Sequence, residues 1–349
     1  MGMPEILIEF KAAAETAITR SGRGIAALIL KDATSGAASY TYARESSIVK
    51  SHWTAVNYDI LQKVFLGAPA GVLVERIGAE DNYDAALERL KNKKWDYLAI
   101  PDIKNQDCKT VADWIIAQRG AKKTFKAVLP SYAGNHEGII NFATEGIKVD
   151  AKTYTTAQYT ARIAGILAGM PLDASSTYSV LPEVTAITEA ADPDGEIDAG
   201  KLILVNDGAH IKIARGVNSL TTLTGNKTED MKKIKIVDGM DLMRNDIRDS
   251  FEGNYIGIAN SYDNKQLFIN ALNVYLRGLA ADGVLSDTFE NRAYIDLAAQ
   301  RVWLEEQDPA WAEKDDNAVK TANTKSYVFA ACNIKLQDAI EDLRFTIMI

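Results

Sequence analysis

The chain has 349 residues, of which 47% are hydrophobic and 25% charged, and its formal net charge is -8. A chain of this length is too long to fold around a single hydrophobic core, which indicates two or three domains. Its hydrophobic content excludes a disordered chain. The acidic balance argues against nucleic acid as a partner, because binding to phosphates needs clustered Lys and Arg.

The two cysteines, Cys108 and Cys332, lie far apart and have no metal-ligand spacing. We expect both to be reduced, buried thiols of a protein made in a reducing cytoplasm. The N-terminus lacks a basic segment followed by an apolar core, so no secretory signal is expected. No apolar run approaches the roughly 20 residues that cross a bilayer, so we expect no membrane insertion.

The N-terminal segment EILIEF has Ile6, Ile8 and Phe10 at every second position, which is typical of a β-strand. A small, polar stretch follows, and we treat residues 1–22 as an N-terminal arm. Strand patterns over 25–32, 39–46 and 71–77 flank a helical pattern over 57–69. These patterns predict a small β-rich unit over residues 23–90.

From residue 81 the pattern alternates between helices and strands. Helices are predicted over 81–95, 108–123 and 155–172, and strands over 96–102, 124–131 and 138–150. Strands joined by such helices pair in parallel with right-handed crossovers, which predicts a central α/β domain over 91–225. Near its end, residues 201–217 predict a hairpin around Asn206-Asp207-Gly208.

The last third predicts an α+β C-terminal domain over 226–325. Residues 233–257 suggest a strand followed by a helix, and further helices are predicted over 262–285 and 291–308. The charged stretch 308–325 is predicted to be a loop or link. Residues 326–349 are predicted to be C-terminal strands and an arm. In that arm every second residue is apolar: Leu343, Phe345, Ile347 and Ile349.

Two strand-like ends leave two readings open. The ends pair within the chain's own sheet, or they pair with sheets of other copies, because an unpaired strand edge is a template for another chain.

The sequence offers little support for catalysis. His52, His136 and His210 have no spacing that would bring ligands together, and neither a nucleophile elbow nor a phosphate loop is present. The acidic run 192–198 loosely resembles a calcium loop, but its glycine stands at position 4 and its twelfth residue is Ile203. We interpret that run as a turn, and we expect no catalytic, cofactor-binding or metal site.

Four segments in order resemble one protein family: residues 4–14, AGILAGMPLDASSTYSVLPEV (164–184), ARGVNSLTTLT (214–224) and residues 236–285. Together they are similar to contractile-tail sheath proteins, in particular the compact sheaths of Gram-positive myophages and R-type phage-tail-like bacteriocins. The likeness covers nearly the whole chain. It implies a multidomain α/β and α+β fold, with a β-rich N-terminal unit, a subtilisin-like central α/β domain without catalytic residues, an α+β C-terminal domain, and strand-forming arms.

The resemblance also implies a structural role without a cofactor. Copies would form a homo-oligomer of stacked rings, a helical sheath around an inner tail tube protein, with baseplate and tail-terminator proteins as further partners in a virion or phage-tail-like particle. The arms would add strands to neighbouring subunits through Ile6, Ile8 and Phe10 at one end and the four apolar residues 343, 345, 347 and 349 at the other. Candidate tube contacts are Arg292, Arg301 and Glu305.

Two other readings remain. The chain is the sheath of a related non-phage contractile injection or secretion system, or it is a non-contractile assembly protein. An enzyme is the least supported reading.

Overall fold

The computed structural model describes residues 18–20, 22–34 and 36–348. Its contacts divide the chain into two units, and each is described here by itself. The first, called the α/β unit, comprises Gly22–Asp241 and Asp338–Ile349. The second, called the C-terminal unit, comprises Leu242–Gln337 with the described residues 18–20. The predicted N-terminal arm residues Ile6, Ile8 and Phe10, and the last residue Ile349, lie outside the described residues.

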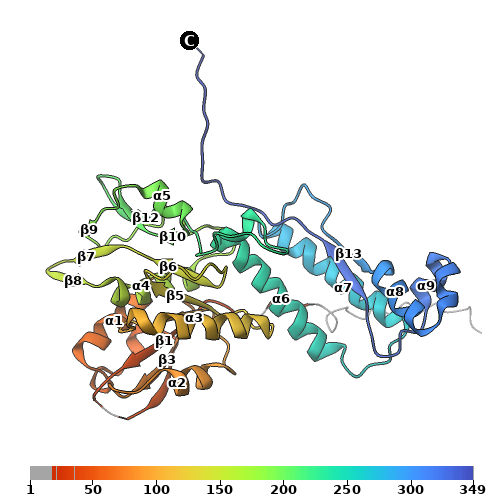
Figure 1. Cartoon of the computed structure of the whole chain (residues 1–349), viewed down its shortest axis with the longest axis horizontal. Helices are drawn as coiled ribbons and strands as arrows, with labels where there is room; N and C mark the ends of the chain where they lie inside the picture. Colours follow the sequence, from red (N-terminus) through yellow and green to blue (C-terminus); the bar gives the residue numbers. More distant parts are fainter. Residues whose placement is uncertain (1–17, 21, 35, 349) are drawn as a thin grey trace, which may run out of the picture. The chain divides into compact units, whose positions relative to one another are not determined.

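A seven-stranded sheet forms the centre of the α/β unit (Figure 1). Its order is β10-β6-β5-β4-β1-β3-β2, and all neighbours are parallel except β2 and β3. The strands are β1 (Ile25–Lys31), β2 (Ala38–Tyr42), β3 (Gly71–Ile77), β4 (Tyr97–Ala99), β5 (Lys126–Pro130), β6 (Ile139–Phe142) and β10 (Lys201–Leu202). The predicted parallel pairing is therefore confirmed.

Helices cover both faces of this sheet, as its nearly continuous apolar strands require. On β1, Ala26, Leu28 and Leu30 belong to the cluster that packs against α1 (Ala55–Phe65) and α4 (Thr156–Gly169). The alternate residues Ala27 and Ile29 belong to a second cluster, with α2 (Asp84–Leu90) and α3 (Asn105–Gly120). Successive side chains point to opposite faces, so one strand supplies both cores.

Helix α4 has strong local signals at both ends. Thr155 and Gln158 form a capping box at its start, and the chain turns away at Met170 and Pro171. Its glycines allow close contact with α1: a Cβ on Gly165 would lie 2.2 Å from the Val64 carbonyl oxygen. The AGILAGMP segment thus specifies both a helix and the helix against which it packs.

Smaller sheets complete the α/β unit. A three-stranded antiparallel sheet contains β7 (Glu145–Val149), β8 (Lys152–Tyr154) and β9 (Ala186–Thr188). The predicted hairpin is confirmed as β11 (Leu204–Asn206) and β12 (Ile211–Ile213). Its turn is held by Asp207, whose carboxylate accepts from the N–H groups of Ala209 and His210. The acidic run 192–198 forms α5 (Pro193–Asp198), with Asp192 as its N-cap.

Residues 233–257 correct one expectation. The predicted strand at their start is wrong, because α6 runs without interruption over Ile234–Asn254. Ile234 and Ile236 alternate as in a strand, but Ile234, Val237 and Asp241 also recur at helical spacing, and all are buried. The boundary between the two units falls inside this helix, after Asp241.

The C-terminal unit contains the end of α6, α7 (Tyr262–Ala281), β13 (Arg292–Ile295), α8 (Leu297–Gln307), α9 (Asp316–Thr321) and β14 (Ala330–Asn333). The single helix predicted over 291–308 is wrong at its start, because β13 comes first and Asp296 then caps α8. The stretch 308–325, predicted to be a loop, contains a 3-10 helix (Pro309–Glu313) and α9. Asp308 and Asp315 cap them, which favours short helices in this charged stretch.

The five predicted domain ranges remain a proposal about organisation. In the structure, β1, β2 and β3 from residues 25–77 lie in the same sheet as β4, β5 and β6. The predicted boundary at residue 90 therefore falls between strands of one sheet.

Candidate assembly interface

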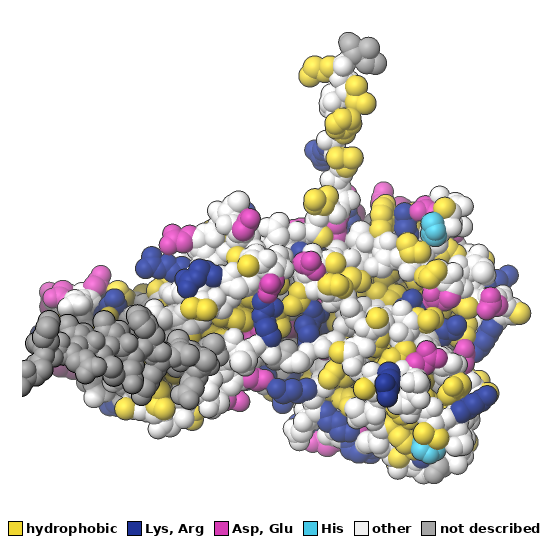
Figure 2. Space-filling model, turned by 180° about the vertical axis from the view of Figure 1, so that it is seen from behind, with side chains coloured by type: hydrophobic (Ala, Val, Ile, Leu, Met, Phe, Trp, Pro, Cys, Tyr) yellow, Lys and Arg dark blue, Asp and Glu magenta, His cyan; other side chains and the backbone are white. Residues whose placement is uncertain are grey.

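Residues 343–348, here called the C-terminal arm, form no helix or strand in the structure (Figure 1). Their apolar side chains are open to solvent: Leu343 is 86% exposed, Phe345 75% and Ile347 72%. Figure 2 shows these hydrophobic side chains along the projecting segment. The alternation of apolar and polar residues predicted a β-strand. Among the described residues of this chain, no strand pairs with residues 343–348. Its pairing with another copy stays a prediction.

The base of the arm, in contrast, is held firmly. Residues 338–342 and the side chains that hold them are here called the arm clasp. Glu341 has a side chain only 5% exposed, and it accepts hydrogen bonds from the hydroxyl groups of Ser175 at 2.9 Å and Thr177 at 2.5 Å. These two hydroxyls come from the segment after α4, so the clasp ties the base of the arm to the α/β unit.

Two ion pairs flank Glu341 in the clasp. Lys233, just before α6, pairs with Asp338. Arg215 pairs with Asp342 at 2.5 Å, and this hydrogen bond lowers the pKa of the Asp342 carboxyl. Glu341 lies within reach of both cations, at 3.9 Å from Arg215 and 3.7 Å from Lys233. The clasp is thus an ionic cluster, and the chain becomes free of it at residue 343.

The C-terminal unit offers an unpaired strand edge of its own. Strands β13 and β14 form an antiparallel two-stranded sheet in which Ala293 lies opposite Cys332. The outer edge of β13 is occupied, because the Asn273 side chain donates to the Ala293 carbonyl at 3.1 Å and accepts from its N–H at 2.8 Å. Asn273 thereby takes the place of a neighbouring strand.

The outer edge of β14 has no such cover in the described part of the chain. Asp296 donates its N–H to the Phe329 carbonyl at 3.0 Å. In an antiparallel pair the backbone groups of successive residues point alternately towards and away from the partner strand, so this bond fixes which residues of β14 face β13. By this alternation, the backbone groups of Ala330 and Cys332 point away from β13, and both residues are exposed. The expectation that Cys332 is buried is therefore wrong, whereas Cys108 is buried as expected. This edge is therefore the side on which the sheet can accept another strand.

A buried charge network anchors the start of α6 within the α/β unit. Asp241 accepts hydrogen bonds from Arg119 at 2.8 and 3.1 Å and from Lys126 at 3.0 Å. Burial alone would raise the pKa of Asp241, but Lys126 and Arg119 outweigh it and lower that pKa. Tyr97 donates to Asp238 at 2.7 Å on the same helix. The network carries positive and negative groups in contact, so removing one partner would leave a buried charge uncompensated.

The histidines are dispersed. His136 accepts from the Gly138 N–H at 2.9 Å, and burial lowers its pKa to about 4. His210 belongs to the β11–β12 turn, and the His52 carbonyl accepts from Arg76. In the part of the chain that the structure describes, no three His, Cys, Asp or Glu residues gather as a metal site, and no helix is long and apolar enough to span a membrane.

The candidate tube contacts lie on two elements. Arg292 stands on β13 with a side chain 69% exposed, 3.5 Å from Glu290. Arg301 on α8 donates to the carbonyls of Trp311 and Lys314 and pairs with Asp316 at 2.7 Å. Glu305 is half-buried on the same helix. Arg301 is thus engaged within its own unit, and a role in tube binding remains a prediction for all three residues.

The arm clasp was not predicted from the sequence. Its signals are visible afterwards: an acidic stretch, Asp338 to Asp342, precedes the apolar alternation. Its partners Ser175, Thr177 and Arg215 lie in two of the four segments that carried the family resemblance.

Comparison with known proteins agrees with that resemblance. The model of the phage tail sheath C-terminal domain matches residues 226–349, and the model of the phage tail sheath protein central domain matches residues 77–219. The chain is 36% identical to a tail sheath protein of Clostridium phage phiCD119 over 358 aligned positions, which cover 99% of both chains. It is 28% identical to the phage-like element PBSX protein XkdK of Bacillus subtilis, over 52% of this chain and 41% of that protein.

Solved structures show the same fold. A sheath tail protein of Desulfitobacterium hafniense superposes with a TM-score of 0.70 at 15% identity, covering 84% of this chain and 94% of that one. The contracted sheath of the anti-feeding prophage gives 0.68 at 14% identity, over 100% and 99% of the two chains. The contracted sheath of an extracellular contractile injection system, PVC, gives 0.70 at 10%, over 100% and 98%. On the full-length match to the phage protein and the two domain matches, the chain belongs to the phage tail sheath protein family.

Proposed function

We propose that the chain is the structural subunit of a contractile tail sheath, and that its C-terminal arm joins neighbouring copies. The observation that carries this proposal is the abrupt change at residue 343. The clasp holds residues 338–342, and the next residues expose alternating Leu343, Phe345 and Ile347. Side chains arranged in this way need a second surface to cover them, and strand addition to β14 of another copy supplies one.

In this proposal, contraction is a change between two ways in which identical subunits pack against one another. Stacked rings surround an inner tail tube, and on release they rotate and approach until the subunit bodies gain contact. The arms must keep their register meanwhile, because separated rings transmit no force. Main-chain hydrogen bonds suit this task, since they hold a strand in place whatever its side chains contact. No nucleotide or metal is needed for such a step.

The proposed setting is a virion or phage-tail-like particle assembled from protein made in a bacterial cytoplasm. The tube, the baseplate and a tail terminator are the proposed partners, with Arg292, Arg301 and Glu305 as candidate tube contacts. The mostly parallel sheet of the α/β unit supports comparison with the shape of subtilisin, without its catalytic function. The likeness to the anti-feeding prophage and PVC sheaths supports the second candidate, a sheath of an injection system outside phages.

Substitutions in the arm test the proposal. A triple variant, Leu343→Ser, Phe345→Ser and Ile347→Ser, should yield a folded subunit that forms no sheaths at concentrations at which the unchanged chain polymerises. The matched control is Arg344→Ser with Thr346→Ser, which alters the other side of the same segment and should leave polymerisation intact. Electron microscopy of negatively stained particles reads the outcome.

Normal sheaths from the triple variant would overturn the role of the arm. Contraction is tested separately, because the particles should show two helical states, before and after a trigger such as urea or acid. A single helical state under every trigger would instead support the non-contractile assembly protein.

A further inference from the structure

Tyr178 is an exposed aromatic residue beside the arm clasp of the α/β unit, and it is 59% exposed. The residue before it, Thr177, donates its hydroxyl to Glu341 in the clasp. The Tyr178 N–H donates to the carbonyl of Ile213 at 2.8 Å, two residues before Arg215 of the clasp. Tyr178 therefore lies next to the point at which the C-terminal arm leaves its subunit.

The backbone of Tyr178 is in the left-handed region, with φ of +60°. Bulky side chains rarely adopt this conformation, because the Cβ atom crowds the backbone and costs free energy, whereas glycine adopts it without strain. The ring does not offset this cost by filling the core, since most of it is exposed. A strained position that carries a large exposed ring indicates a function outside the subunit's own core.

The ring of Tyr178 is held in place by a cation. The Lys212 ammonium lies 3.8 Å from the ring centroid and also donates to the Asp207 carboxylate at 2.8 Å. Val180, which is bridged to Lys212, is 44% exposed. Tyr178, Val180 and Lys212 are here called the Tyr178 face. A ring that is already fixed loses little conformational entropy when a partner covers it.

The length of the arm limits the distance to the copy that receives it. The arm and Ile349 together have seven residues, which span about 23 Å when fully extended. Strand β14 has four residues. If four arm residues pair with it, three of the seven remain, and these cover about 10 Å between the two copies. The Tyr178 face stands at the near end of this gap, so the receiving copy must lie close to it.

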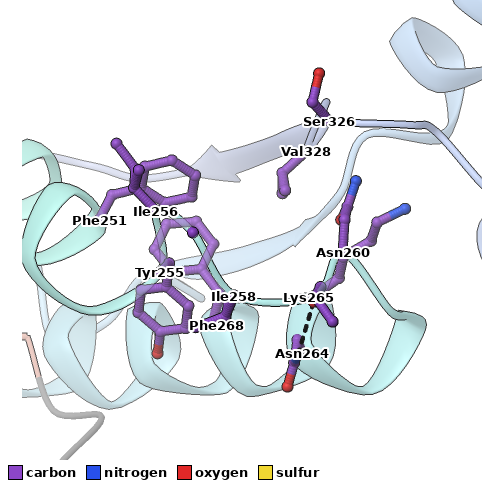
Figure 3. A pocket seen from close by; sticks show the side chains of 12 residues that line it. Phe251, Tyr255, Ile256, Ile258, Asn260, Asn264, Lys265, Phe268, Ser326 and Val328 are labelled. Carbon is purple, nitrogen blue, oxygen red and sulfur yellow. Dashed lines mark hydrogen bonds between the residues drawn. The ribbon is translucent and has the colours of Figure 1, made fainter.

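The receiving C-terminal unit has apolar surface beside β14. A pocket of about 340 Å³ is lined by Val328, which precedes β14 by two residues, and by Ile256 and Ile258 (Figure 3). These two isoleucines are 64% and 48% exposed. The amine of Lys265 in this pocket is already engaged, because it donates to Thr324 at 2.7 Å. The surface beside β14 therefore favours an apolar partner.

We propose that the Tyr178 face of one copy packs against the C-terminal unit of the copy that receives its arm. The face contributes an aromatic ring and a valine, and the receiving unit contributes exposed apolar side chains near β14. Tyrosine is enriched among the residues that carry most of the energy of protein interfaces. The contact sets the orientation of the receiving copy, which a single extended link leaves open. This inference rests on the proposed function of the arm.

A glycine at position 178 separates the role of the ring from the stability of the subunit. The full-length Tyr178→Gly variant loses the ring and the backbone strain together, so it should unfold at the same urea concentration as the unchanged chain or at a higher one. It should raise the subunit concentration needed for sheath formation about tenfold, because a tyrosine is no longer buried between copies. Tyr178→Phe keeps the ring and should leave that concentration unchanged.

The matched control is Asp150→Gly, which makes the same backbone change at an exposed residue with φ of +51° in the turn between β7 and β8. It should form sheaths at the same concentration as the unchanged chain. Equal thresholds for the two glycine variants would overturn the proposed contact.

Photo-crosslinking identifies the partner surface. The full-length chain carrying p-benzoylphenylalanine at position 178 is assembled with an equal amount of ¹⁵N-labelled chain. Mass spectrometry should find crosslinks that join labelled and unlabelled copies and map to residues 242–337. An absence of crosslinks between copies, or crosslinks that reach only residues 22–241 of the other copy, would overturn the proposal.

The two proposals fail in different ways. If the arm triple variant abolishes sheaths while Tyr178→Gly does not raise the threshold, the arm keeps its role and the contact at Tyr178 is excluded. If the arm triple variant forms normal sheaths, the proposed function itself fails.

Discussion

Asp342 accepts a 2.5 Å ion-paired hydrogen bond from Arg215, one residue before the C-terminal arm begins. This pair marks the position at which the chain changes from a held segment to an exposed one. A sheath subunit that stays connected while it rotates needs such a fixed point, because the length of free arm sets how far a neighbour can move.

Replacing Arg215 by Met should loosen the base of the arm with little effect on overall stability, since partly exposed ion pairs contribute little to the free energy of unfolding. Hydrogen exchange of the unassembled subunit should become faster in residues 338–342 and stay unchanged elsewhere. One molar NaCl should produce the same change in the unchanged chain. Lys109→Met, which removes an exposed pair with Asp113 on α3, is the matched control. Equal exchange rates in the two variants would argue against the clasp.

Gly165→Ala should destabilise the α/β unit by about 1 to 3 kcal/mol, because the added methyl group would overlap the Val64 carbonyl of α1. Gly120→Ala at the end of α3 makes the same chemical change where nothing lies within 4 Å, and should be neutral or slightly stabilising. Urea unfolding of the two variants measures the difference. A Gly165→Ala protein as stable as the parent would show that α1 and α4 are not in close contact.

Asp241→Ala should cost about 3 to 5 kcal/mol of unfolding free energy, because it leaves the cations of Arg119 and Lys126 buried without their shared carboxylate. Asp113→Ala makes the same substitution in an exposed pair and should leave stability unchanged. Equilibrium denaturation in urea compares them. Similar midpoints for both variants would show that the network does not anchor α6.

Stability should fall as the pH drops from about 6.5 towards 4. Burial lowers the pKa of His136 to about 4, so the unfolded chain takes up a proton in this range while the folded chain does not. The loss should reach about 2 to 3 kcal/mol for this group, in addition to any loss from carboxylates.

His136→Asn should remove that part of the pH dependence, since the Asn side chain can still accept from the Gly138 N–H without titrating. Urea unfolding between pH 4 and 8 should show the unchanged protein losing about 2 to 3 kcal/mol more than the variant as the pH falls. Parallel curves over the whole range would mean that His136 is not buried in its neutral form.

Much of the fold could be predicted because its signals are local. The residue pattern and the terminating residues lie within a short stretch of sequence for each of three elements: the apolar strand β1, the capped helix α4 and the hairpin around Asn206-Asp207-Gly208. The start of α6 could not be read in this way, because Ile234, Ile236 and Val237 fit both a strand and a helix. The buried pairing of Asp241 with Arg119, 122 residues earlier, joins two distant parts of the chain.

The assembly interface was predictable only in part. The alternation in residues 343–348 indicated a strand, since this pattern needs no knowledge of the rest of the chain. That the strand serves as an arm was implied only by the family resemblance. The clasp joins Glu341 to Ser175, which are 166 residues apart, and no local pattern announces such a contact. The blocked edge of β13 likewise depends on Asn273, an ordinary polar residue of α7 until the fold brings it to Ala293.

A cryo-EM reconstruction of assembled sheaths tests the central claim most directly, by tracing residues 343–348 from one subunit to the next. The account predicts that this segment lies as an added strand along β14 of a neighbouring copy, in both the extended and the contracted state. A trace that returns to its own subunit, or an arm that separates from its neighbour on contraction, would contradict it.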